Sequence, residues 1–172
     1  MKKLVSIFLV LAMAVLAGCK EKVPAGFPEV HPVTLTVTDG SEKLPNIRVM
    51  FYPDSGNTGY GITGTTDASG TAILHTMQAA HAAKGAPAGS YTVTLEDVIE
   101  VPGDKTPGEI VAMTLPEQKA YHDEQVKKRA AIPKKIPEAL NKKATSKVKQ
   151  TVSTGENNIT IDVSQYKGGT KK

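Results

Sequence analysis

The chain has little of several residue types on which other protein classes depend. Among its 172 residues there is one cysteine, no tryptophan and only three phenylalanines. A single cysteine cannot form an intramolecular disulfide, which excludes a small secreted domain stapled by disulfides. Long apolar runs are also scarce: the N-terminal run spans residues 4–17, whereas a bilayer-spanning helix needs about 20. The sequence therefore excludes a multi-span membrane protein as well.

The N-terminal apolar run has the flanks of a secretory signal peptide. Lys2 and Lys3 precede it, and it closes on a small-residue site that ends at Gly18, directly before Cys19. A basic start, a short apolar segment and small residues at its end are typical of secretory signals. We expect cleavage after Gly18, which excludes a cytosolic enzyme and leaves 172 − 18 = 154 residues. That length suits one domain with a modest elaboration.

The cleavage site, Leu16-Ala17-Gly18-Cys19, resembles the lipobox of bacterial lipoproteins. In that family the cysteine sulfur takes a diacylglyceryl group, and the amine freed by cleavage is acylated. The resemblance implies lipidation of Cys19 and a membrane anchor, since each buried CH₂ contributes about 0.8 kcal/mol. Lys20 implies sorting to the outer membrane, facing the periplasm or the surface, with the inner membrane as the alternative. An ordinary signal peptide followed by a chance cysteine is the competing interpretation.

Basic residues gather in one part of the chain. The net charge is +4, yet the segment 127–149 alone holds nine basic residues against one acid, Glu138. A contact with an anionic surface is one interpretation, and a solvated face is the other. We do not expect nucleic acid as a partner, because no aromatic residues interleave with these lysines. The candidates for an anionic-surface contact are Lys134, Lys135, Lys142 and Lys143.

Alternating apolar residues predict a β-sandwich over residues 33–165. Residues 19–32 are rich in proline and read as a tether. Beyond them, apolar residues recur at every second position in short segments separated by turn residues, which is typical of half-buried strands. We expect an all-β antiparallel sandwich whose last two strands form a hairpin. The expected strands are 33–38, 47–52, 71–76, 90–95, 147–153 and 158–163.

Two stretches lack this alternation. Residues 77–86 hold five alanines and are expected to form a loop with one helical turn. Residues 102–146 read as an insertion, in which a weakly amphipathic helix begins near Pro116 and stops at Ile132-Pro133. A second short helical turn is expected at 136–140. The glycine- and lysine-rich tail, 166–172, is expected to fray.

Three motifs in order resemble those of the carboxypeptidase regulatory-like domains, which are transthyretin-like sandwiches. The first is Asp39-Gly40 followed by residues 44–53, the second is the turn at 66–72, and the third is the strand at 87–93. Residues 136–158 resemble the closing segment of a bacterial lipoprotein branch of these domains. Ala72 departs from the pattern, because an aromatic residue is more usual there. The resemblance implies an accessory or binding module and no specific activity.

The motif residues have structural roles in this interpretation. Gly70 and Gly89 permit backbone turns, and the Asp67 side chain caps one of them. Tyr91 fills the core, where its hydroxyl can reach a partner. We therefore expect no catalytic residue among them.

An enzymatic alternative exists within the same fold. Hydroxyisourate hydrolase, a transthyretin relative, uses histidines, an arginine and a C-terminal tyrosine motif, of which His31 and residues 166–169 are a superficial echo. Thr65 and Thr66 stand where that family has its arginine, and the chain continues past the motif. A lipid-anchored location also disagrees with purine catabolism. We expect a non-enzymatic protein.

No metal or cofactor is expected. The four histidines, at 31, 75, 81 and 122, lack the spacing of metal ligands. Asp39, Asp54 and Asp67 all lie in expected turns, where Ca²⁺ binding is one interpretation and turn capping is the simpler one.

Tyr60 is the best-placed candidate for a ligand-binding aromatic, because it lies in a glycine-rich loop at 59–66. Two hypotheses follow. In the first, the sandwich is a binding or assembly module for another envelope protein. In the second, it binds a small ligand or carbohydrate, or hydrolyses one, at the Tyr60 loop. A pocket that gathers His75 or His81 with an aspartate and a tyrosine would favour the second.

Overall fold

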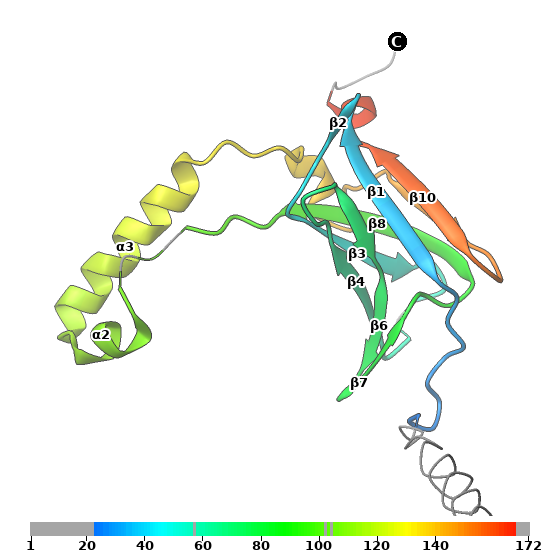
Figure 1. Cartoon of the computed structure of the whole chain (residues 1–172), viewed down its shortest axis with the longest axis horizontal. Coiled ribbons are helices and arrows are strands. Elements are labelled where there is room, and N and C mark those ends of the chain that lie inside the picture. The colour runs from blue at the N-terminus through cyan, green and yellow to red at the C-terminus, as the bar shows by residue number, and fades with distance from the viewer. Residues whose placement is uncertain (1–22, 57, 102, 104, 168–172) are drawn as a thin grey trace, which may run out of the picture.

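The computed structural model of the chain describes residues 23–56, 58–101, 103 and 105–167. The expected signal peptide, Cys19 and the tail from residue 168 lie outside this part of the chain. The described residues form two facing β-sheets, with two helices held to one side (Figure 1). The expected all-β sandwich is confirmed.

The larger sheet has six strands, each antiparallel to its neighbours. In spatial order they are β7 (His81–Lys84), β6 (His75–Gln78), β4 (Gly61–Thr65), β3 (Ile47–Pro53), β8 (Gly89–Asp97) and β9 (Lys149–Val152). The smaller sheet is built on β1 (Val33–Asp39), which pairs with β10 (Asn157–Asp162), β2 (Glu42–Lys43) and β5 (Thr71–Ile73). β1 and β10 run parallel, which departs from the purely antiparallel sandwich that we expected.

The core lies between the two sheets and is supplied by alternate strand positions. In β1, β3 and β8 every second side chain points inward, as strand geometry requires, and these side chains are buried. Each such side chain, once buried, contributes about 1.5 to 3 kcal/mol relative to exposure. The inward residues of the three strands are Val33, Leu35, Val37, Ile47, Val49, Phe51, Tyr91, Val93 and Leu95.

The expected C-terminal hairpin is wrong. β9 pairs with β8 in the larger sheet, whereas β10 pairs with β1 in the smaller one, so the connection between them crosses from one sheet to the other. The Asn157 side chain ties this crossing together: its Nδ2 donates to the Ser153 and Gly155 carbonyls at 2.9 Å each, and its Oδ1 accepts from the Ser153 N–H at 2.9 Å. These hydrogen bonds satisfy the backbone polar groups of the connection between the two sheets. β9 and β10 can then each bury apolar side chains in the core, one from each sheet.

The expected strand 71–76 is divided between the sheets. β5 pairs with β1 and β6 pairs with β4, with buried Leu74 at the junction. The expected loop at 77–86 is wrong as well, because β6 and β7 form a hairpin there, with Ala79 at φ 52° in its turn. Alanine has the highest helix propensity, but propensity is a small local preference that the strand pairing outweighs here. Gly85 ends the hairpin at φ 116°, where a Cβ would lie 2.2 Å from the His31 carbonyl oxygen.

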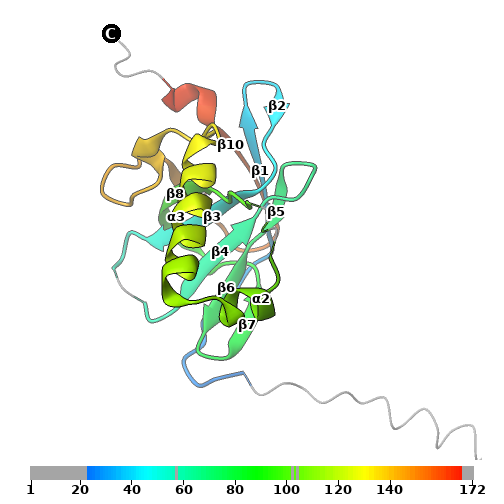
Figure 2. The same cartoon turned by 90° about the vertical axis from the view of Figure 1, so that its left-hand side faces the viewer.

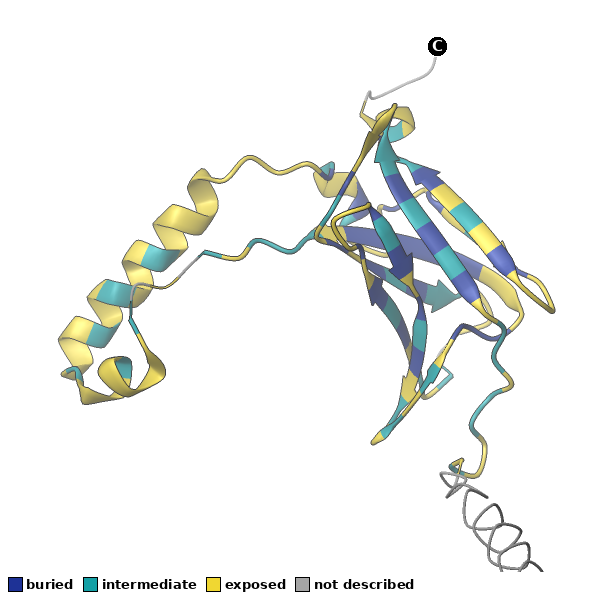
Figure 3. Cartoon of the chain, viewed as in Figure 1, coloured by how far each residue is buried: buried dark blue, intermediate teal, exposed yellow. Residues whose placement is uncertain are grey.

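The insertion forms a helical arm, defined here as α2 (Pro107–Ala112) and α3 (Leu115–Ala131). The expected helix is α3, while α2 was not expected. Both helices begin at a Thr-x-x-Glu capping box, Thr106 with Glu109 and Thr114 with Glu117. The helical arm stands apart from the sandwich, and Figure 3 shows its surface as mainly exposed. No helix in the described part of the chain is long and apolar enough to cross a membrane.

Two short 3₁₀ helices complete the described part of the chain. The expected turn near 136–140 is η2 (Glu138–Leu140), whose Leu140 side chain is buried in the core beside Ile136. The chain then leaves β10 through η3 (Val163–Tyr166). The N-terminal segment leaves β1 at the other end of the sandwich from η3 (Figure 1).

Candidate functional site

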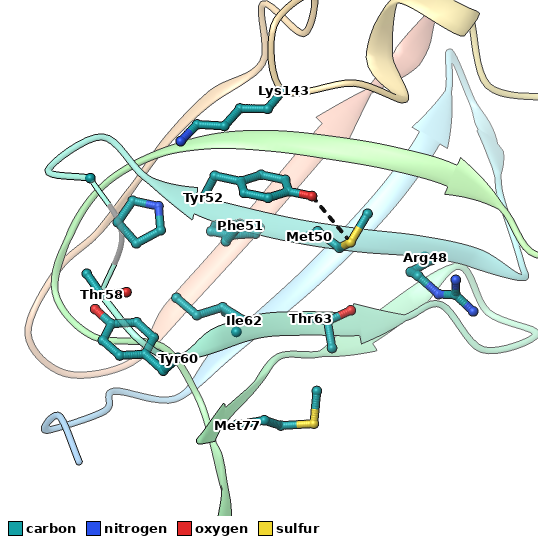
Figure 4. Close-up of a pocket in the computed structure, with 13 residues that line it drawn as sticks. Arg48, Met50, Phe51, Tyr52, Thr58, Tyr60, Ile62, Thr63, Met77 and Lys143 are labelled. Atoms are coloured by element: carbon teal, nitrogen blue, oxygen red, sulfur yellow. Dashed lines mark hydrogen bonds between the residues drawn. The ribbon is translucent and has the colours of Figure 1, made fainter. Parts of the chain in front are cut away.

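A groove runs across the outer face of the six-stranded sheet. Its central strand, β4, presents the small residues Gly61 and Thr63 outward, and the neighbouring strands present longer side chains. Met50 and Tyr52 rise from β3 on one side, and Met77 rises from β6 on the other (Figure 4). Because side chains alternate in register across a sheet, short residues between long ones leave a trough. We call this trough the Tyr52 groove, and its volume is about 560 Å³.

Two cations flank the Tyr52 groove. Lys143 lies on one side with its Nζ 5.5 Å from the centroid of the Tyr52 ring, and Arg48 lies at the far end of the same face (Figure 4). Arg48 also pairs with Glu96 across 3.6 Å. No Asp, Glu or His is among the described residues that line the groove. Its charge is therefore positive at the rim and its floor is mostly apolar.

Tyr60 lies at the mouth of the Tyr52 groove, partly buried against the core. The sequence placed this residue in a loop, whereas the glycine-rich stretch behind it is strand β4. Thr58 lies beside it, and its buried hydroxyl has no hydrogen-bond partner among the described residues. Sequence reasoning did not single out Met50 or Met77. Alternation along β3 does place Met50 on the same outward face as Tyr52, and this pattern could have identified Met50 from the sequence.

The histidines are not among the described residues that line the groove, although His75 of β6 pairs with Thr63 of β4. His31 Nδ1 accepts from the Gly155 N–H at 3.3 Å, and the His81 ring meets Phe27 edge-on with centroids 4.6 Å apart. Neither His75 nor His81 lines the Tyr52 groove. The gathering of histidine, aspartate and tyrosine that would favour hydrolysis is not present in the described pockets.

Asp67 closes a turn. Its Oδ1 accepts from the Ser69 N–H at 2.8 Å, from the Ser69 hydroxyl at 2.7 Å and from the Thr71 N–H at 3.0 Å. These bonds hold the pKa of Asp67 below its usual value, chiefly through the Ser69 hydroxyl. Gly70 in the same turn has φ 71° and lies against Lys43 of β2. The motif therefore has a structural role: it fixes the turn and packs it against the smaller sheet.

Asp39 and Gly40 bind the C-terminal end of the sandwich. The Asp39 carboxylate pairs with the Lys167 ammonium, and the Gly40 N–H donates to Asp162 Oδ1 at 2.8 Å. The bond from Gly40 is the first cause of a lowered pKa at Asp162. This turn therefore holds η3 in place. In the part of the chain that the structure describes, no group of three or more metal-ligating side chains gathers.

Tyr91 fills the core at the start of β8, which begins at Gly89 with φ 156°. Its ring packs near Phe51 with centroids 5.5 Å apart, and its hydroxyl donates to the Pro87 carbonyl at 2.6 Å. Burial raises the pKa of Tyr91 to about 12. The residue braces the loop before β8 and does not reach the Tyr52 groove.

Asp54 belongs to a small surface network at the end of β3. Its Oδ1 accepts from the Thr92 hydroxyl at 2.7 Å and from Lys149 Nζ at 3.1 Å. The Thr92 bond is the main cause of the lowered pKa of Asp54, followed by the Lys149 bond. This carboxylate therefore connects β8 and β9 through its hydrogen bonds to Thr92 and Lys149.

The four lysines singled out from the sequence lie at different places. Lys143 borders the Tyr52 groove, whereas Lys134 borders a second hollow of about 540 Å³ that also includes Arg48 and Arg129. The Lys135 N–H donates to Asp97 Oδ1 at 3.1 Å, and its side chain is exposed. Lys142 is exposed next to Lys143. Two of the four, Lys134 and Lys143, thus border the hollows on the outer side of the sheet, and both of these hollows include Arg48.

Comparison with protein-family models, with curated proteins and with solved structures finds no match to this chain.

Proposed function

We propose that this chain is a lipid-anchored protein of the bacterial cell envelope whose sandwich is a non-catalytic binding or assembly module. The lipobox-like site at Cys19 supports the anchor. The turn motifs that resemble carboxypeptidase regulatory-like domains support the module, since Asp67 and Tyr91 act there as braces. The outer membrane is the proposed location, on the basis of Lys20.

The position of the tether supports display close to a membrane. Phe27 of the tether contacts His81 of β7, so the β6–β7 end of the sandwich faces the anchor. Eight residue steps separate Cys19 from Phe27, and an extended chain spans at most about 3.6 Å per residue. That end of the sandwich would lie within about 30 Å of the lipid surface.

The single observation that carries the binding role is the Tyr52 groove. It offers aromatic and thioether surface with two cations at its rim, and its described lining lacks the acid and base pairs that catalysis requires. Another envelope protein is the first proposed partner of the module. A small ligand is the second candidate, and the groove, with Tyr60 at its mouth, favours it.

The anchor is tested by replacing Cys19 with alanine in cells fed an alkyne-tagged palmitate. The wild-type chain should carry the label and sediment with membranes, whereas Cys19→Ala should lose the label and appear in the soluble fraction. Lys20→Ala, which keeps the cysteine, serves as the matched control and should stay labelled and membrane-bound. A Cys19→Ala chain that remains in the membrane fraction with unchanged mobility would overturn the proposal.

A further inference from the structure

The chemistry of the Tyr52 groove restricts what can occupy it. Its walls are formed by Met50, Tyr52 and Met77. The two central hydroxyls already donate within the sheet, from Thr63 to the Val49 carbonyl at 3.0 Å and from Tyr52 to the Met50 sulfur at 3.6 Å. Thioether side chains are flexible and polarizable, so they adapt to apolar ligands of varied shape. A sugar would need a denser array of hydrogen-bonding groups than this floor supplies. The groove therefore favours a ligand with an apolar body.

Charge complementarity adds a second requirement. Both charged side chains that line the groove are cations, and Glu96 already pairs with one of them, Arg48. Lys143 is the better anchor for a ligand, because its ammonium lies over the Tyr52 ring. Asp54 interacts electrostatically with Lys143, but its carboxylate is already engaged by Thr92 and Lys149. An anionic group placed at Lys143 gains a charge-assisted hydrogen bond.

The helical arm lies on the same side of the molecule as the Tyr52 groove, but it borders a different hollow. In Figure 2, α3 stands in front of the outer face of the six-stranded sheet, and in Figure 1 it is separated from that face. Val126 and Arg129 of α3 share a hollow with Arg48 of the sheet, which fixes the side of the helix that faces inward. No residue of the arm is among the described residues that line the Tyr52 groove. The groove volume therefore sets the size of the occupant.

We propose that the Tyr52 groove binds a single-chain amphiphilic carboxylate, one molecule at a time. The apolar chain lies along β4 over Met50 and Met77, and the carboxylate accepts a hydrogen bond from Lys143 Nζ. This assignment rests on the second candidate of the proposed function, a module that binds a small ligand. The groove volume of about 560 Å³ lies in the range of small-molecule sites, about 300 to 1,000 Å³.

The five methionines of the chain supply a direct readout. In the Cys19→Ala chain, labelled at the methionine methyl groups and kept free of detergent, dodecanoate below its micelle concentration should shift the Met50 and Met77 signals. Met113 lies in the arm and should not move. Dodecyltrimethylammonium, with the opposite charge, should bind about tenfold more weakly, because it gains no bond at Lys143. Equal binding of the two amphiphiles would overturn the role of Lys143.

Matched variants distinguish binding at the Tyr52 groove from non-specific binding to exposed apolar side chains. Lys143→Gln should weaken dodecanoate binding about tenfold, while Lys142→Gln at the neighbouring exposed position should leave it unchanged. Met77→Ser should also weaken it, and Ile73→Ser should not, since Ile73 is similarly exposed but lies in β5 of the smaller sheet. Equal losses in a variant and its control, or shifts of Met113 as large as those of Met50, would contradict the proposal.

Other occupants give different results. If vesicles of anionic phospholipid shift Met50 and Met77 as dodecanoate does, the groove contacts a membrane surface and the proposal fails. If the chain is dimeric in light scattering and Met77→Ser dissociates the dimer, a second copy occupies the groove. If dodecanoate fails to bind while Cys19 is labelled with palmitate, the ligand assignment is wrong and the anchored module stands.

Discussion

The sandwich and the helical arm are stabilised in opposite ways. Strands β1, β3 and β8 each bury three apolar side chains in a shared core, whereas α2 and α3 bury none. The arm relies on its two capping boxes and on an ion pair from Lys128 to Glu124 at 2.7 Å, four residues apart. Isolated helices of this length are marginal in water. Tertiary packing therefore stabilises the sandwich, whereas local interactions along the sequence stabilise the arm.

Removing a leucine side chain from each region should affect the two regions very differently. Leu95→Ala empties a fully buried site between the sheets and should lower the free energy of unfolding by about 2 to 5 kcal/mol. Leu115→Ala in α3, where the side chain is 81% exposed, should change it by no more than about 0.5 kcal/mol. Urea denaturation measures both. Similar losses would mean that the arm packs as tightly as the core.

Glycine offers a second matched pair. Gly85→Ala should destabilise the sandwich by about 1 to 3 kcal/mol, because φ is 116° and the new Cβ would collide with the His31 carbonyl. Gly108→Ala in α2 has open space around it and should raise helix content instead. Thermal unfolding and circular dichroism report the two effects. A neutral Gly85→Ala would show that the β6–β7 hairpin can shift away from β1.

Tyr91 tests the buried hydrogen bond. Tyr91→Phe leaves the Pro87 carbonyl without its partner and should cost about 1 kcal/mol, whereas Tyr121→Phe in the arm should have little effect. Because burial raises the pKa of Tyr91 to about 12, the protonated form is favoured in the folded state. The wild type should keep its full stability below about pH 10 and lose part of it as the pH rises towards 12. Urea midpoints measured across that range should fall less in Tyr91→Phe.

The smallest effect concerns the caps of the arm. The pKa of Glu117 is lowered, first by the Thr114 hydroxyl and then by the Thr114 backbone N–H, and Glu109 is bonded to Thr106 in the same way. A lowered pKa means that this support is complete above the ordinary value near 4.5 and is lost as the pH falls below it. Helix content should therefore decline between about pH 5 and 3. Glu117→Ala should show a lower helix signal at pH 7 with the sandwich midpoint unchanged; a shifted midpoint would contradict independence.

Much of the fold could be predicted because alternation marks a strand that buries one face. Val33, Leu35 and Val37 identify β1 without any knowledge of its partners. β4 was not predicted because its outward residues are glycine and threonine. The β6–β7 hairpin was not predicted because its alanines favour helix. Strand partners depend on long-range geometry, which is why the expected pairing of β9 with β10 is wrong. The sequence identified Tyr60 as a candidate. The groove itself could not be predicted, because it forms only where β3, β4 and β6 pair side by side.

The proposed ligand site lies on the sandwich, and the arm lies beside it. The methionine methyl spectrum of the Cys19→Ala chain, recorded with increasing dodecanoate, is the sharpest test of this site, because one experiment reports on both regions. We expect saturable shifts at Met50 and Met77 with Met113 unmoved. Shifts confined to Met113, or no shift at any methionine, would show that the Tyr52 groove does not bind this ligand.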